Sequence, residues 1–336
     1  MRIAVFSTRD YDRRFLDAAN AAAGHAIDYF EARLDPSSAP LAQGYPAVCL
    51  FVNDRLDAAT LKRLAAGGLK IVALRCAGFN NVDLAAADAA GVAVVRVPAY
   101  SPEAVAEFTI GLILALERNI PRAYARVREN NFALDGLIGR NLAGRTAGVV
   151  GTGRIGALVA RALRLGFGCE VLASDLREDP ALVAIGVRYV PPAELLRTAD
   201  LITLHCPLTP ATHYLIDAAV IAAARPRLTV INTSRGALID TAALIEGLKS
   251  RKVGGVALDV YEQEADLFFE DLSNEIVQDD MFQRLLTFPN VLITGHQAFL
   301  TEEALAAIAE TTLGSLTDAE AGRPLRHRVT AEKVRG

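Results

Sequence analysis

Three side chains with complementary chemistry follow short apolar runs in the second half of the chain: Arg235, Glu264 and His296. The planar guanidinium of Arg235 can hold a carboxylate through two parallel hydrogen bonds. An imidazole titrates near neutral pH, so His296 can donate a proton to a ketone oxygen and remove it in the reverse direction. Glu264 can hydrogen-bond the other ring nitrogen and favour the imidazolium. The set predicts hydride-transfer chemistry on a small carboxylic acid.

Each of the three residues also has a purely structural interpretation. Arg235 can pair with a surface acid, and a single histidine at a strand end is more often structural than catalytic. Glu264 belongs to an acidic run, Glu262–Asp280, that is typical of a solvated loop. The sequence does not show that the three side chains meet, so these alternatives stay open here.

A glycine-rich motif indicates what would supply the hydride. The apolar run Thr146–Val150 leads into Gly151, Gly153 and Gly156, followed by a helical pattern at Ala157–Leu165. In this strand–loop–helix context, the glycines permit a tight turn, close approach to a pyrophosphate and close helix packing. Asp175 ends the next strand, where a carboxylate accepts ribose hydroxyls and repels a 2′-phosphate. The motif predicts a dinucleotide site that favours NAD over NADP, although Arg177 lies nearby.

The elements that must position these residues alternate between strand and helix along the whole chain, which predicts parallel α/β sheets. Ligands bind beyond the carboxyl ends of such strands, where all the residues above fall. The predicted strands of the second series are Thr146–Val150, Glu170–Ser174, Val187–Val190, Leu201–Leu204, Leu228–Asn232, Gly255–Asp259 and Val291–Thr294.

An earlier strand series precedes a predicted hinge at Pro98–Pro102 and a largely apolar helix at Pro102–Asn119. Its strands are Arg2–Phe6, Ala26–Phe30, Ala47–Phe51, Lys70–Leu74 and Val92–Val95. A last helix, Thr301–Ala321, has no strand predicted after it and is expected to dock on an earlier element. We therefore expect two Rossmann-like or flavodoxin-like, doubly wound α/β domains with a cleft between them. Residues 1–100 plus 299–336 form a discontinuous substrate domain, and residues 101–298 bind NAD.

Composition limits the classes of partner. Thirty-five Lys and Arg against 39 Asp and Glu give a net charge of −4, which argues against nucleic acid and anionic lipid as partners. The N-terminus lacks the apolar run of a signal peptide, and the longest apolar stretch is too short to span a bilayer. The four cysteines lack the spacing of a metal site, so no metal is predicted and they fit buried thiols in the cytoplasm.

His205 and Cys206 are adjacent and resemble a nucleophile pair. Neighbouring residues on a strand point to opposite faces, which argues against a Cys–His dyad. We expect their backbone to line the dinucleotide site instead.

Seven motifs together resemble the D-2-hydroxyacid dehydrogenase family over residues 1 to about 324. They are Arg75-Cys-Ala-Gly-Phe-Asn-Asn-Val-Asp83, Tyr100-Ser-Pro-Glu-Ala-Val-Ala-Glu107, Val150-Gly-Thr-Gly-Arg-Ile-Gly156, Leu204-His-Cys-Pro-Leu-Thr209, Asn232-Thr-Ser-Arg-Gly-Ala-Leu-Ile-Asp240, Ala257-Leu-Asp-Val-Tyr-Glu262 and Thr294-Gly-His-Gln-Ala-Phe-Leu-Thr301.

The resemblance implies roles for particular residues. Arg235, Glu264 and His296 would be the catalytic set, with His296 as the acid and base. The backbone of Cys76, Ala77 and Gly78 would bind the substrate carboxylate with Arg235, and Tyr100 and Phe299 would border its side chain. The implied NAD contacts, added to Gly151, Gly153 and Gly156, are Arg154, Ile155, Asp175, Cys206, Pro207, Thr233, Ser234, Arg235, Asp259 and, less securely because relatives often carry Asn there, Thr212.

Two departures from the broad family pattern resemble its fermentative D-lactate dehydrogenase branch. Gly295 stands where many relatives have proline, and the stretch Tyr261–Asn274 is long and poor in proline. The implied activity is NAD-dependent reduction of pyruvate to D-lactate by a homo-oligomer, a dimer or tetramer, built around the Pro102–Asn119 helix. Two alternatives stay open: a bulkier 2-keto acid, such as phenylpyruvate or hydroxypyruvate, and an NAD(H)-sensing binding protein like the corepressors on this fold.

Overall fold

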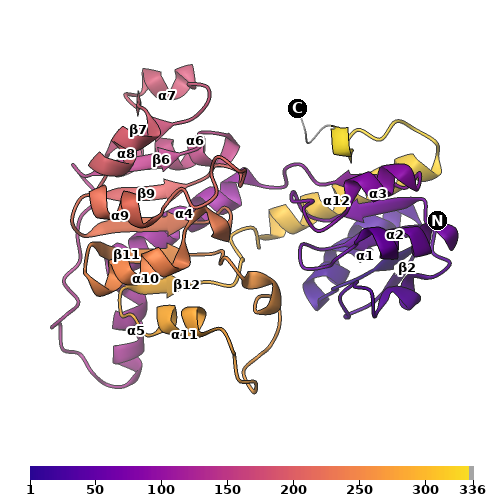
Figure 1. The fold of residues 1–336 in the computed structure, drawn as a ribbon, viewed down its shortest axis with the longest axis horizontal. Helices are drawn as coiled ribbons and strands as arrows, with labels where there is room; N and C mark the ends of the chain where they lie inside the picture. The colour runs from indigo at the N-terminus through magenta and orange to yellow at the C-terminus, as the bar shows by residue number, and fades with distance from the viewer. Residues whose placement is uncertain (333–336) are drawn as a thin grey trace. The chain divides into compact units, whose positions relative to one another are not determined.

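A computed structural model describes residues 1–332, and within them the chain forms two compact units (Figure 1). Unit 1 is Met1–Ser101 together with the chain from Leu300 onward, and unit 2 is Pro102–Phe299. The chain passes between the units at Ser101–Pro102 and at Phe299–Leu300. Residues 333–336, which belong to the predicted substrate domain, lie outside the described residues.

Unit 1 contains a sheet in the order β13-β5-β4-β3-β1-β2, and the pairs from β5 to β2 are parallel. The five predicted strands of this unit are confirmed to within a residue at each end. Their bounds are β1 (Arg2–Val5), β2 (Ala26–Tyr29), β3 (Ala47–Leu50), β4 (Ile71–Leu74) and β5 (Ala93–Arg96).

One expectation for this unit is wrong, because a strand does follow the last helix. β13 (Arg328–Val329) pairs antiparallel with β5, with Arg328 opposite Val95. Two residues, one of them charged, give no apolar run that a sequence pattern could detect. The pairing depends on the open edge of β5, which supplies the unpaired backbone groups.

Helices cover both faces of this sheet. On one face, Leu313 and Leu316 of the last helix pack with Val5, Cys49 and other strand residues. The opposite face packs against Leu61 and Leu64. The helices are α1 (Asp10–Ala23), η1 (Ala39–Ala42), α2 (Ala58–Ala66), α3 (Leu84–Ala89) and α12 (Glu302–Glu320).

Unit 2 contains a sheet in the order β12-β11-β10-β9-β6-β7-β8, and its pairs are all parallel, as predicted. The order reverses between β6 and β9, which is where doubly wound sheets bind their ligands. The strands are β6 (Thr146–Val150), β7 (Glu170–Ser174), β8 (Arg188–Tyr189), β9 (Leu201–Leu204), β10 (Leu228–Asn232), β11 (Val253–Leu258) and β12 (Val291–Ile293).

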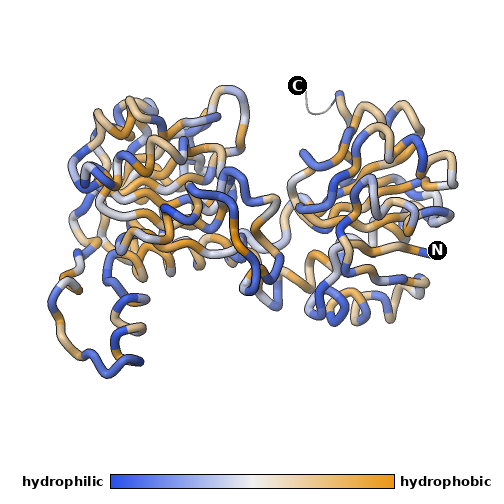
Figure 2. Tube along the Cα trace, turned by 60° about the horizontal axis from the view of Figure 1, so that its bottom comes forward, coloured by the Kyte–Doolittle hydropathy of each residue, from blue (hydrophilic) through white to orange (hydrophobic). Residues whose placement is uncertain are grey.

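The helices of unit 2 enclose this sheet, and the apolar segments lie mainly inside each unit (Figure 2). The predicted apolar helix is confirmed as α4, which buries Leu112 and Ile113 against the sheet. No helix among residues 1–332 combines the length and apolarity needed to cross a bilayer. The elements are α4 (Pro102–Glu117), α5 (Ile120–Arg128), α6 (Arg154–Arg161), η2 (Ala162–Gly166), α7 (Pro180–Ala184), α8 (Pro192–Thr198), α9 (Ala218–Ala223), η3 (Gly236–Leu238), α10 (Thr241–Lys249), η4 (Glu264–Asp266) and α11 (Asp280–Leu286).

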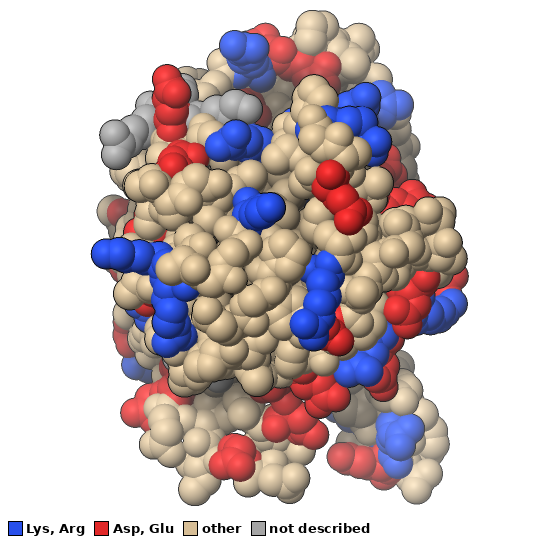
Figure 3. Space-filling model, turned by 90° about the vertical axis from the view of Figure 1, so that its right-hand side faces the viewer, with Lys and Arg blue, Asp and Glu red and all other residues tan. Residues whose placement is uncertain are grey.

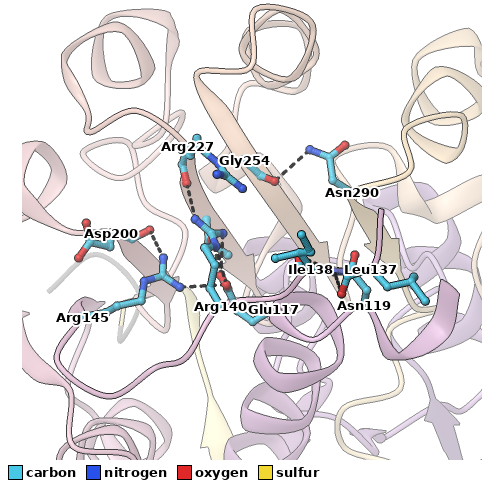
Figure 4. Close-up of polar contacts among 11 residues, drawn as sticks. Glu117, Asn119, Leu137, Ile138, Arg140, Arg145, Asp200, Arg227, Gly254 and Asn290 are labelled. Atoms are coloured by element: carbon cyan, nitrogen blue, oxygen red, sulfur yellow. Dashed lines mark hydrogen bonds and ion pairs between the residues drawn. The ribbon is translucent and has the colours of Figure 1, made fainter. Parts of the chain in front are cut away.

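A buried ion-pair cluster fixes the base of an arm formed by α5 and the extended segment after it (Figures 1 and 4). The Glu117 side chain is 1% exposed. Arg140 donates to both of its oxygens, at 2.9 and 3.0 Å, and Arg145 and Thr229 lie 2.9 and 2.7 Å from it. Asn119 donates to the carbonyl groups of Leu137 and Ile138, both at 3.4 Å. These contacts join the two ends of the arm to the sheet.

Charged side chains of both signs are spread over the face of the molecule drawn in Figure 3, and neither sign forms a continuous patch there. This distribution agrees with the small net charge of −4.

Candidate active site

The glycine-rich loop has the geometry expected of a pyrophosphate site. Gly151 follows β6 with φ at +87°, a conformation that favours glycine. A Cβ at Gly156 would overlap the carbonyl oxygen of Gly151, whereas the side of Gly153 is open. Gly153 is also the N-cap of α6, so the helix begins at Arg154 and not at Ala157 as predicted. The loop backbone can therefore approach an anion closely at the start of this helix.

Asp175 follows β7 and is held as a carboxylate. Its oxygens accept from the backbone N–H of Thr152 at 2.5 Å and of Leu176 at 2.6 Å. Partial burial alone would raise its pKa, but the hydrogen bonds from Thr152, Leu176 and Arg177 outweigh that effect and lower the pKa. An ionised Asp175 suits the ribose hydroxyls of NAD. The sequence did not indicate Thr152 as its partner, because the motif leaves that position unspecified.

The hydroxyl groups of Thr233 and Ser234, which follow β10, and of Thr109 in α4 each donate their hydrogen to a protein acceptor. Ser234 donates to the Cys206 carbonyl at 2.8 Å. Thr109 of α4 donates to the Val105 carbonyl at 2.7 Å, and its oxygen lies 2.9 Å from the Thr233 hydroxyl. Because Thr109 has one hydrogen, Thr233 must donate to it. The sequence did not predict the contact between Thr109 and Thr233, because the two residues are 124 positions apart.

Arg235 stands beside these hydroxyls at the start of η3. Its Nη1 donates to the Ser234 carbonyl at 2.7 Å, and Asn232 donates to the Arg235 carbonyl at 2.8 Å. Within residues 1–332 the Arg235 guanidinium forms no ion pair, so the surface-acid alternative lacks support. The rest of its planar donor fork stays available for an anion.

His296 and Glu264 are brought together within unit 2. The His296 Nδ1 lies 2.9 Å from Glu264 Oε1, and the second Glu264 oxygen accepts from the Tyr261 N–H at 2.9 Å. Both side chains are about one-fifth exposed, at 19% and 21%. A carboxylate at Nδ1 favours the tautomer that carries hydrogen there, which leaves Nε2 to exchange a proton. Glu264 is mostly buried and bonded to His296 and Tyr261, so it is not merely a side chain of a solvated loop.

Asp259, predicted as a cofactor contact, supports the backbone around His296. Its side chain is buried and accepts from the N–H groups of Gln297 and Ala298, both at 2.9 Å, and from the Thr294 hydroxyl at 2.6 Å. His296 itself has φ at +54°, an uncommon conformation for a residue other than glycine. The three bonds hold the segment that carries this strained residue.

The remaining predicted residues lie in different parts of the chain. Cys76, Ala77 and Gly78 follow β4 and Tyr100 follows β5, so these four belong to unit 1. Phe299 is the last residue of unit 2 and is 8% exposed. In unit 2, Arg154 and Ile155 begin α6, and Pro207 and Thr212 lie between β9 and α9. The sequence also missed Phe269, whose ring centroid lies 5.7 Å from that of His296.

His205 is not arranged as part of a nucleophilic pair. Its Nε2 lies 2.9 Å from the Thr203 hydroxyl, and burial lowers its pKa to about 3, so it is neutral. Burial raises the pKa of the Cys206 thiol to about 11. A neutral, poorly acidic thiol is a weak nucleophile. All four cysteines are free and buried, as predicted.

Comparisons with known proteins place the chain in a family. Residues 110–298 match "D-isomer specific 2-hydroxyacid dehydrogenase, NAD binding domain". A "2-hydroxyacid dehydrogenase homolog 1" of Schizosaccharomyces pombe is 55% identical over 95% of this chain and 96% of its own length. The D-lactate dehydrogenase of Escherichia coli is 50% identical over 96% and 98%.

A solved structure gives the same result for the fold. A protein described as the pyruvate reductase of Chlamydomonas reinhardtii aligns with a TM-score of 0.92 at 46% identity, over 97% of this chain and 98% of its own. The glycine loop and the ionised Asp175 fit the cofactor that the matched family binds. This chain therefore belongs to the D-isomer specific 2-hydroxyacid dehydrogenases and is an NAD-dependent enzyme of that family.

Proposed function

We propose that this enzyme reduces pyruvate to D-lactate. The observation that carries the proposal is the His296–Glu264 pair, 2.9 Å apart. In the same unit, the Arg235 guanidinium has no acidic partner within the described chain. An acid that delivers one proton and a cation that binds one carboxylate are what a 2-keto acid requires. The relatives named D-lactate dehydrogenase and pyruvate reductase support pyruvate as that acid.

The chain's own residues would act as follows. Arg235 binds the substrate carboxylate. The family resemblance implies the same role for the backbone of Cys76–Gly78, and it implies that Tyr100 and Phe299 border the methyl group. The cofactor, when bound, supplies the hydride. Protonated His296 gives the proton on Nε2 to the ketone oxygen, while Glu264 stabilises the imidazolium until that proton has left. In the reverse direction, neutral His296 takes the proton from the hydroxyl group.

A bulkier 2-keto acid is the alternative substrate, and a panel of 2-keto acids decides between the two. NADH oxidation is measured with pyruvate, hydroxypyruvate and phenylpyruvate, and the product enantiomer is analysed. Preference for pyruvate with D-lactate as the product is expected. Turnover of the larger acids alone would contradict pyruvate but keep the mechanism, whereas NADH binding without any turnover would favour a sensor.

We infer that a second copy of the chain is its protein partner and that it acts in the cytoplasm. α4 and α6 expose an apolar groove lined by Ile110, Leu114 and Leu158. The arm exposes Phe132 and Leu134, at 70% and 80%. Apolar surface of this kind favours association. Sedimentation is expected to give a dimer or tetramer, and a monomer at micromolar concentration would contradict the inference.

A further inference from the structure

The Cys76–Gly78 turn of unit 1 has three successive carbonyl groups fixed by three different donors. The Cys76 carbonyl accepts from the Val97 N–H at 3.2 Å. The Gly78 carbonyl accepts from the Cys76 thiol at 3.3 Å. The Ala77 carbonyl accepts from Arg96 Nη1 at 2.7 Å, which is the shortest of the three bonds and the only one with a charged donor. Such charge-assisted bonds are about twice as strong as neutral ones.

Fixing these carbonyl groups also fixes the N–H groups that follow them. In a trans peptide, the C=O of one residue and the N–H of the next point in opposite directions. The N–H groups of Ala77, Gly78 and Phe79 are therefore directed away from Val97, Arg96 and the thiol. Among residues 1–332, none of these three N–H groups has an acceptor. Successive unpaired N–H groups in a turn form a binding site for an anion.

Arg96, the last residue of β5, contacts the middle residue of this turn and the aromatic ring that follows the turn. Its guanidinium bonds the Ala77 carbonyl and lies 5.0 Å from the centroid of the Phe79 ring. No carboxylate in the described chain pairs with Arg96. Its uncompensated positive charge lies on the carbonyl side of the Ala77–Gly78 peptide. There it polarises the peptide and makes the Gly78 N–H on the opposite side a stronger donor.

We propose that Arg96 is a positioning residue for the substrate carboxylate. It turns the Ala77–Gly78 peptide so that the Gly78 N–H is presented to the carboxylate, and its charge strengthens that bond. The proposal rests on the proposed function, in which this turn binds the carboxylate of a 2-keto acid. Ala77 and Arg96 are 19 positions apart, which explains why a sequence motif does not reveal the contact.

The experiment compares Arg96→Met, Arg96→Lys and a control, Arg2→Met. Arg2 also lies on a strand of unit 1 over an aromatic ring, 4.4 Å from the Tyr45 centroid, but it does not contact the turn. Four constants are measured: kcat, the KM for pyruvate, the inhibition constant of oxamate (a carboxylate analogue that is not reduced) and the Kd of NADH.

Arg96→Met is expected to raise the KM for pyruvate and the inhibition constant of oxamate about tenfold or more, because one aligned bond to a charged group is lost. The Kd of NADH is expected to stay within twofold. Arg96→Lys should recover part of the loss, since an ammonium keeps the charge and can donate one bond to Ala77. Arg2→Met should change none of the four constants.

Two outcomes separate the failure of this proposal from failure of the proposed function. If the wild type reduces pyruvate and Arg96→Met leaves KM and oxamate inhibition within twofold, Arg96 has no positioning role and the function stands. If the wild type reduces no 2-keto acid, the function fails, and oxamate titration of the NADH complex then tests Arg96 alone. Equal oxamate affinity of the wild type and Arg96→Met would overturn the proposal. If Arg96→Met is too unstable to assay, Arg96→Gln, which removes the charge, decides, and an oxamate affinity within twofold of the wild type there would also overturn the proposal.

Discussion

Replacing Glu264 by glutamine separates the charge of the carboxylate from its hydrogen bond. Glu264 uses one oxygen to contact His296 and the other to accept from the Tyr261 N–H, both at 2.9 Å. Glutamine has nearly the same shape and retains one acceptor oxygen, so His296 keeps a partner of similar size. The negative charge that stabilises the imidazolium is removed.

The geometry sets the expected magnitude. Two unit charges roughly 4 Å apart interact by about 4 kcal/mol at an effective dielectric constant of ~20. Both side chains are about one-fifth exposed, at 19% and 21%, so solvent screens part of this attraction. We expect a loss of about 1.5–3 kcal/mol in the transition state, which corresponds to a decrease in kcat of roughly 10–100-fold.

The assay is steady-state kcat at saturating pyruvate and NADH, with the Kd of NADH measured separately. Glu275→Gln is the control, because it makes the same change of charge at an exposed position of the same segment. The Kd of NADH should be unaltered in both variants, and kcat should fall only in Glu264→Gln. A kcat within twofold of the wild type in Glu264→Gln would refute the role of its charge.

Arg235→Lys keeps the charge but loses the planar guanidinium, so kcat/KM for pyruvate should fall about 10–100-fold in steady-state kinetics. A near-normal kcat/KM would show that binding of the carboxylate by the planar guanidinium is not required. His296→Ala should bind NADH like the wild type and lose turnover by about 100-fold or more; unchanged turnover would remove His296 from the mechanism. Gly156→Ala places a Cβ on the Gly151 carbonyl, so titration should show NADH affinity about tenfold or more weaker, and equal affinity would contradict the loop geometry. Glu117→Gln weakens a buried ion-pair cluster and should lower the free energy of unfolding by about 3 kcal/mol. Its thermal midpoint should fall about 6–12 °C by circular dichroism, and a midpoint within 2 °C or so would argue against the cluster.

Local sequence determined the parallel strands of the two α/β sheets. Thr146–Val150 and Leu228–Asn232 are apolar enough to be strands buried on both faces, and the structure has them with these bounds. The start of α6 was misplaced because the motif glycines resemble a loop, although Gly153 caps the helix directly. β13 was missed because two residues carry no periodic pattern, and its pairing depends on β5.

The sequence by itself also determined the types of the reactive groups, because few reactions use a histidine, an arginine and a glutamate together. Only the tertiary structure decided which groups meet. The 2.9 Å contact of His296 with Glu264 spans 32 residues, that of Thr109 with Thr233 spans 124, and Arg96 reaches Ala77 across 19. The first and the last of these contacts join segments that neighbouring parallel strands bring side by side, and the second joins helix α4 to the end of β10. Connections of this kind leave no fixed spacing in the sequence. The sequence therefore specifies the chemistry, and the sheet specifies the partners.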